Sequence, residues 1–102
     1  SPEKFIEQWN STDGVCQCRK LTTGRRTAFR ARSKDLDWIA NVDAALAKVA
    51  ASDFCSGDNG RGWRADIDWF LRPDTLTKII EGKYDNRNGN PTTEQPALQF
   101  DN

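Results

Sequence analysis

The chain has 102 residues, of which 36% are hydrophobic and 29% are charged, a composition typical of a soluble helical domain. This length allows one domain, and no apolar run is long enough to predict a membrane-spanning helix. Fifteen basic and fifteen acidic residues give a formal net charge of zero, so the total charge indicates no partner until the charges are located.

Residues 2–10 predict a short amphipathic helix. Phe5, Ile6 and Trp9 lie at positions i, i+1 and i+4, which places them on one side of a helix. Residues 10–14 are a cluster of turn formers, so the helix is expected to end there and a connection to follow.

A second helix is expected to begin at Thr22 or Thr23, since either hydroxyl can cap a helix. It lies within residues 19–34, which hold seven basic residues and no acidic one. Two interpretations of this basic island stay open: a solvated face with weak salt bridges, and a surface that contacts nucleic-acid phosphates. The basic island, and with it the candidate nucleic-acid-binding set, consists of Arg19, Lys20, Arg25, Arg26, Arg30, Arg32 and Lys34.

The longest helix is expected to open at Ser33 or Asp35 and to run to about Ser52. Its apolar residues follow three- and four-residue steps, and its alanines favour close approach of a neighbouring helix. We expect it to be the central helix of the core, with a buried stripe of Leu36, Trp38, Ile39, Val42, Ala45, Leu46, Val49 and Ala50.

Residues 56–62 contain three glycines and predict a flexible loop. A phosphate-binding loop is not expected, because neither Lys-Ser nor Lys-Thr follows and no predicted strand precedes it. We interpret the loop as a connection that lets Phe54 and Trp63 pack on one core. The alternative is a contact loop that uses Arg61 and Arg64.

Residues 62–86 form the segment richest in large apolar side chains. Most of its aromatic residues are expected in the core, which needs their area in so small a domain. Trp69 falls off the helical stripe, so two interpretations stay open for it: burial in the core, or exposure to a partner together with nearby cations. The stripe is Trp63, Ile67, Phe70 and Leu71, and the candidate partner-binding residues are Arg64, Trp69, Arg72 and Lys78.

Pro73 divides this segment into two helices, because its ring cannot continue a helix. Asp66 is expected to cap the first helix and Asp74 the second, and Gly82 to end the second in a left-handed conformation. Residues 85–102 have too little apolar content to fold and predict a disordered tail or linker.

These elements predict an all-α fold, a compact single domain of four to five short helices over residues 1–84. The chain starts at Ser1, directly in an amphipathic pattern and without a signal peptide, so we expect a fragment of a longer protein.

Cysteine and histidine content limits the chemistry. Three cysteines, Cys16, Cys18 and Cys55, are an odd number, which argues against a secreted disulfide scaffold and fits a reducing cytoplasm. Histidine is absent, so the commonest general base and metal ligand is missing, and an Asp would have to complete any metal site. We therefore expect a binding module that is not an enzyme and has no metal or cofactor.

Short motifs spread in order over residues 3–86 resemble a known family. The first set is Trp9-Asn10, Lys20-Leu21-Thr22, Arg25-Arg26 and Ala31-Arg32. The second, more specific set is Ser52-Asp53-Phe54, Gly57, Gly62-Trp63, DWFLRPD at 68–74 and KIIEGKYDN at 78–86. Together they resemble the C-terminal module of bacteriophage replication-initiation proteins, the replisome organisers, and more distantly the primosomal helicase loaders of the DnaD type. Cys55 departs from the pattern, in which an apolar residue such as Leu is usual.

The resemblance implies a role in replication initiation. In such proteins a DNA-binding winged-helix region commonly precedes a helical module that helps bring the replicative helicase to the origin, often with contact to single-stranded DNA. It implies a phage- or prophage-encoded module in the bacterial cytoplasm that binds the host replicative helicase or another replisome protein. We expect single-stranded DNA rather than a specific duplex as its nucleic acid. No winged-helix region is present, so origin recognition is not assigned to this chain.

Two other function classes stay open. A helix-turn-helix transcriptional regulator is disfavoured, because the basic helix begins with Gly24 and is rich in Arg but poor in the Asn, Gln and Ser that read base edges. A pure protein-interaction domain would bind no nucleic acid at moderate salt. Binding to single strands, specific duplex and random duplex separates these classes.

Overall fold

A computed structural model describes residues 1–86 of the chain. These residues form five helices and, apart from one isolated bridge, no strand, which confirms the predicted all-α fold and its compact single domain. The predicted tail lies outside the described residues from residue 87 onward. The helices are α1 (Pro2–Asn10), α2 (Thr23–Ser33), α3 (Leu36–Ala51), α4 (Ile67–Phe70) and α5 (Thr75–Ile80).

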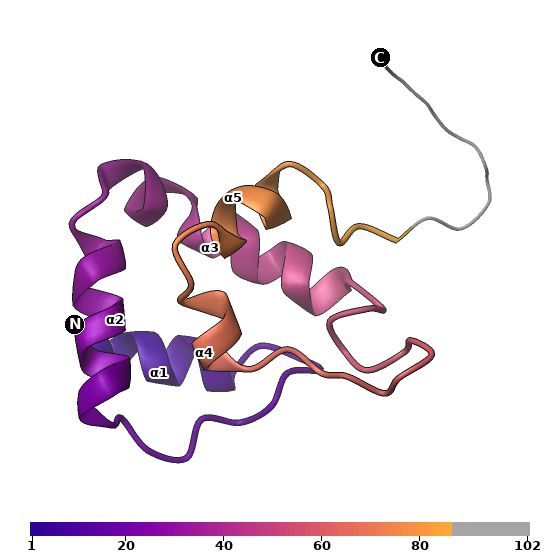
Figure 1. Cartoon of the computed structure of the whole chain (residues 1–102), viewed down its shortest axis with the longest axis horizontal. Coiled ribbons are helices and arrows are strands. Elements are labelled where there is room, and N and C mark those ends of the chain that lie inside the picture. Colours follow the sequence, from indigo (N-terminus) through magenta and orange to yellow (C-terminus); the bar gives the residue numbers. More distant parts are fainter. Residues whose placement is uncertain (87–102) are drawn as a thin grey trace.

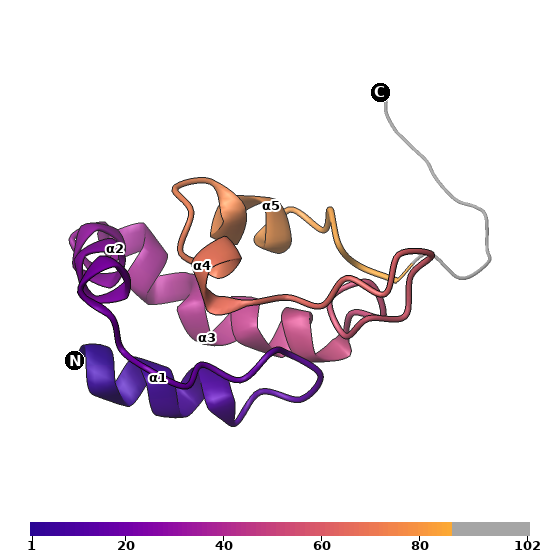
Figure 2. The same ribbon diagram turned by 60° about the horizontal axis from the view of Figure 1, so that its bottom comes forward.

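Helix α3 forms the centre of the molecule. Figure 2 shows α1 on one side of α3, and α4 and α5 on the other. Helix α5 packs mainly on α3, while α2 packs against both α1 and α3. As a result, α2 closes one end of the molecule and the loop between α3 and α4 forms the other end (Figure 1).

Local sequence signals set the helix ends. The side chains of Thr22, Asp35 and Asp66 accept hydrogen bonds from first-turn N–H groups of α2, α3 and α4, as predicted. Asp74 precedes α5 at the predicted position, but its side chain makes no capping hydrogen bond. Gly82 has a φ of 91° just beyond α5, the left-handed conformation in which glycine ends helices.

An aromatic core joins the first four helices. Phe5 and Trp9 of α1, Trp38 of α3 and Phe70 of α4 are buried. The ring centroids of their contacting pairs lie between 5.4 and 6.1 Å apart, the range of favourable aromatic contacts. Phe29 of α2 stacks on Phe5 at 5.1 Å, which holds α2 to this core.

The predicted stripe of α3 is wrong at its start and at Ala50, which is exposed. Leu36 is 82% exposed and Ile39 is 44% exposed, whereas Trp38 is buried. Two residues turn a helix by about 200°, so Leu36 lies on the side opposite Trp38. The buried residues of α3 are Trp38, Ala45, Leu46 and Val49.

The predicted stripe from Trp63 to Leu71 is correct for Ile67, Phe70 and Leu71, which are buried, and wrong for Trp63, which is half-buried and precedes the helix. Helix α4 begins only at Ile67, because Asp66 caps it there. Trp63 therefore lies in the preceding loop, and its contacts are not fixed by helical spacing.

The loop between α3 and α4 is tied to the connection after α1. The Cys16 N–H donates to the Ala65 carbonyl at 2.8 Å, and the Ala65 N–H donates to the Cys55 carbonyl at 2.8 Å. Gly14 has a φ of 83°, and a Cβ added to it would lie 2.6 Å from the Ser56 Cβ. This approach requires glycine on both counts.

Residues after α5 are fastened to the end of α3. The Ser52 hydroxyl donates to the Tyr84 carbonyl at 2.6 Å, and the Asn86 side-chain amide donates to the Ala51 carbonyl at 3.0 Å. The fold thus extends two residues beyond the predicted boundary at residue 84. These bonds bring Tyr84 to the loop end of the molecule.

Candidate functional site

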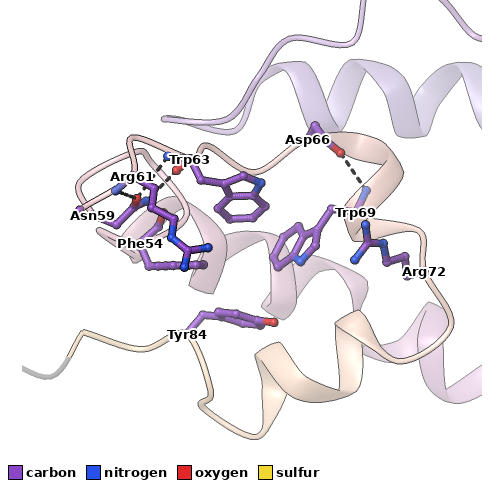
Figure 3. Close-up of a pocket in the computed structure, with 9 residues that line it drawn as sticks. Phe54, Asn59, Arg61, Trp63, Asp66, Trp69, Arg72 and Tyr84 are labelled. Carbon is purple, nitrogen blue, oxygen red and sulfur yellow. Dashed lines mark hydrogen bonds between the residues drawn. The ribbon is translucent and has the colours of Figure 1, made fainter.

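A pocket of about 540 Å³ opens between the loop after α3, the start of α4 and the segment after α5 (Figure 3). We call it the aromatic pocket. Its aromatic lining is Phe54, Trp63, Trp69 and Tyr84. Its other lining residues include Asn59, Arg61, Asp66 and Arg72.

The four rings form a closed circuit of contacts. Phe54 lies 5.1 Å from Trp63 and 5.6 Å from Tyr84, measured between ring centroids. Trp69 completes the circuit at 5.2 Å from Trp63 and 5.3 Å from Tyr84, with interplanar angles of 76° to both. Perpendicular and stacked ring pairs are the favourable aromatic arrangements, so the rings support one another.

Trp69 is not free on the surface, so of its two sequence-based interpretations the burial in the core holds and the exposed partner contact is wrong. Only 8% of Trp69 is exposed, because Trp63 and Tyr84 pack edge-on against it. Phe54, which was expected to pack on the core, is 42% exposed. The ring most open to solvent in this pocket is thus one that the sequence pattern did not single out.

Asn59 organises the loop that carries three pocket residues. Its side-chain amide donates to the Phe54 carbonyl at 2.9 Å and to the Trp63 carbonyl at 2.7 Å. Its side-chain oxygen accepts from the Arg61 N–H at 2.9 Å and from the Trp63 N–H at 3.2 Å. One side chain therefore fixes where Phe54, Arg61 and Trp63 leave the backbone.

The charged residues of the pocket are mainly cations. Arg61 and Arg72 are exposed, and neither forms an ion pair within residues 1–86. Figure 3 shows Arg61 on the loop side of the rings and Arg72 beyond Trp69. Asp66 is the carboxylate of this pocket, and one of its oxygens accepts a hydrogen bond from the backbone N–H of Trp69 at 2.8 Å.

A second hollow of about 350 Å³ adjoins the aromatic pocket, since both share Phe54 and Tyr84. Lys83 lines this hollow, with its Nζ 5.9 Å from the centre of the Tyr84 ring. Asp85 also lines it but is held by Lys48 at 3.0 Å. The two hollows therefore share the stacked Phe54 and Tyr84 rings, and each has at least one cation in its lining.

Two arginines of the basic island have carboxylate partners from other helices. Arg25 binds Asp68 through two bonds of 3.1 and 3.2 Å, and Arg26 binds Glu3 at 3.0 Å. The hydrogen bond to Asp68 raises the pKa of Arg25. The pKa of Glu3 is lowered, first by a hydrogen bond from its own backbone and then by Arg26. Although residues 19–34 contain no acidic residue, part of the basic island is therefore neutralised by carboxylates from other helices.

The rest of the basic island divides by exposure. Arg32 is half-buried, and its Nε is buried without a hydrogen-bond partner among the described residues. Four cations remain exposed and form no ion pair within residues 1–86. They are Arg19 and Lys20 before α2, and Arg30 and Lys34 at its C-terminal end.

The candidate partner-binding residues do not form one site. Trp69 and Arg72 line the aromatic pocket, whereas Arg64 and Lys78 are exposed elsewhere and do not line it. Sequence reasoning missed Asn59 as an organising residue and Tyr84 as a pocket wall. The Asp-Asn-Gly turn around Asn59 is the signal that could have identified the former.

Other kinds of site have little support in the described part of the chain. Residues 1–86 contain no group of three or more His, Cys, Asp or Glu residues placed to hold a metal ion. None of their helices combines the length and apolar content needed to cross a membrane. Burial raises the pKa of the Cys55 thiol, partly offset by a hydrogen bond with Ser52, so the thiol is kept protonated.

Comparison with known proteins finds no matching family model, no matching curated protein and no matching solved structure. The functional argument therefore rests on the residues of this chain.

Proposed function

We propose that this chain is a non-enzymatic accessory module of DNA replication initiation that binds single-stranded DNA and the replicative helicase or another replisome protein. We place it in the bacterial cytoplasm, encoded by a phage or prophage. The motif resemblance over residues 3–86 supports the assignment to DNA replication initiation. The observation that carries DNA binding is the set of exposed cations without ion pairs, Arg19, Lys20, Arg30 and Lys34.

The unpaired cations are the phosphate contacts in this proposal. Arg25 and Arg26 already neutralise carboxylates, so a phosphate would have to compete with Asp68 and Glu3. Each phosphate neutralised on a single strand contributes about 0.7 to the slope of log affinity against log salt. Four contacts predict a slope of about −3, and loss of Arg30 and Lys34 should halve it.

The test is fluorescence anisotropy of a labelled 12-base single strand across a salt series. The variant Arg30→Gln/Lys34→Gln should bind more weakly and with half the salt dependence. Lys78→Gln removes an exposed cation from α5 and serves as the matched control. Equal affinity and slope for wild type and the double variant would refute DNA contact at this surface. Specific duplex bound more tightly than single strands would favour the transcriptional regulator.

Protein binding is supported by a separate observation. The exposed Leu36 and Ile39 lie at the start of α3. Ile39 borders a hollow of about 150 Å³ lined by five apolar residues of α1, α2 and α3 and by Ser1, Lys4 and Gln8. Exposed apolar side chains that cluster beside a hollow are typical of protein contacts. A pull-down from a bacterial lysate, read by mass spectrometry, should recover the replicative helicase with wild type and lose it with Leu36→Ser/Ile39→Ser. Recovery of another replisome protein would reassign the partner, and retention by the variant would exclude this surface.

A further inference from the structure

We propose that the aromatic pocket holds one unpaired base of single-stranded DNA, stacked on its rings, with the neighbouring phosphates bound by Arg61 and Arg72. This inference deepens the proposed function and rests on it, because it assigns a second contact to the same ligand. The residues that line the pocket all lie between Phe54 and Tyr84 in the sequence, outside the basic island, so the two contacts use different side chains.

The size of the pocket suits a nucleotide. Its volume of about 540 Å³ falls within the range of small-ligand sites. Bases bind single-strand-binding proteins by stacking on aromatic side chains, which requires a ring face open to solvent. Phe54, at 42% exposure, is the pocket ring most accessible to a base, and its contacts with Trp63 and Tyr84 hold the ring in place.

The cationic side chains around the pocket argue against an organic cation, the other common ligand of aromatic pockets. Sets of aromatic rings also bind quaternary ammonium groups through their negative faces. Here Arg61 and Arg72 line the pocket without counter-ions in the described part of the chain, and Lys83 lines the adjoining hollow. A cationic ligand would be repelled by these three side chains. A flat ligand that carries negative charge satisfies both the rings and the cations, and a nucleotide is such a ligand.

Asp66 is compatible with a base. One of its oxygens accepts a hydrogen bond from the backbone N–H of Trp69, so the carboxylate has a structural role as the cap of α4. Its second oxygen is left for the N–H or amino group on the edge of a base, which carboxylates accept readily. A phosphate beside Asp66 would be repelled, which places the base rather than the phosphate at this wall.

The adjoining hollow gives the strand a path. It shares Phe54 and Tyr84 with the aromatic pocket and adds Lys83. The stacked pair of rings, at an interplanar angle of 18°, borders both hollows with aromatic surface. The next nucleotide along the strand fits this second hollow, with Lys83 near its phosphate.

The experiment compares a labelled 12-base thymidine strand with an abasic strand of the same length and phosphate number. Wild type should bind the thymidine strand at least about fivefold more tightly, the lower end of the effect of one stacked base. Phe54→Ser should abolish this preference, and Arg61→Gln/Arg72→Gln should weaken binding of both strands. Arg64→Gln, which removes a cation of the same loop outside the pocket, is the control. Unchanged melting temperatures check that each variant folds.

The outcomes separate this inference from the proposed function. Absence of binding to either strand at low salt would refute the proposed function and with it this site. Equal affinity of wild type for thymidine and abasic strands would refute the stacked base and leave phosphate binding intact. Quenching of tryptophan fluorescence by a peptide ending in a phenylalanine carboxylate, without quenching by the thymidine strand, would show a peptide site and overturn the proposal.

Discussion

Replacement of Asn59 by Ala should unfold the pocket before it unfolds the domain. The side chain makes four hydrogen bonds to the backbone of its own loop. At about 1 kcal/mol for each net bond, the upper limit of the loss is about 4 kcal/mol. The loop is largely exposed and its freed backbone groups can bind water, so we expect a loss of about 2 kcal/mol.

Urea denaturation followed by circular dichroism measures the loss of stability, and amide hydrogen exchange locates it. The N–H groups of Arg61 and Trp63 should lose their protection first, because Asn59 is their acceptor. Asn41→Ala is the matched control. The side-chain amide of Asn41 bonds only to Asp37 within α3, and alanine favours a helix. The free energy of unfolding should therefore change by less than about 0.5 kcal/mol. Unchanged stability and exchange in Asn59→Ala would refute the organising role.

Three further predictions concern Gly14, Cys16 and Cys55, which lie in the connections after α1 and α3. Gly14→Ala should destabilise the fold by about 2 kcal/mol or more in urea, because the new Cβ meets Ser56 and the φ is positive, whereas Gly60→Ala, with open space around it, should change little. In the native protein an alkylating reagent should modify Cys16, which is exposed, and leave Cys18 and Cys55 unmodified, because both are buried. Burial raises the pKa of Cys55, so its contribution to stability is full below the usual thiol pKa and is lost as the pH rises through the raised value. A stability that stays constant through this alkaline range would contradict that contribution.

The parts of the fold that follow from short-range chemistry could be predicted from the sequence. Thr22, Asp35 and Asp66 cap helices through side chains that reach only two or three residues along the chain, and Gly82 ends one through its own backbone freedom. Helical periodicity gave the existence of the central helix for the same reason. Periodicity did not predict that Leu36 is exposed, because the exposure of a helix residue depends on how far the neighbouring helices cover that helix.

The aromatic pocket could not be predicted, because its walls come from distant parts of the chain. Phe54 and Tyr84 meet only because the segment after α5 is bonded to the end of α3 through Ser52 and Asn86. Composition favoured burial of most aromatic residues, and five of the nine in residues 1–86 are buried. The departure at Phe54 depends on the shape of the loop, which Asn59 sets through contacts that no periodic pattern records.

The pairing of Arg25 with Asp68 changes how the basic island must be tested. Asp68 directly precedes Trp69 in α4, so the bidentate bond helps to fix the helix that carries one wall of the pocket. Removal of Arg25 would disturb both surfaces at once, and a loss of DNA binding would then have two causes. Arg30 and Lys34 form no ion pair in residues 1–86, so their replacement changes phosphate contact without moving α4. The paired arginines link α2 to α4 and α1, and the unpaired cations are where phosphate contact can be measured.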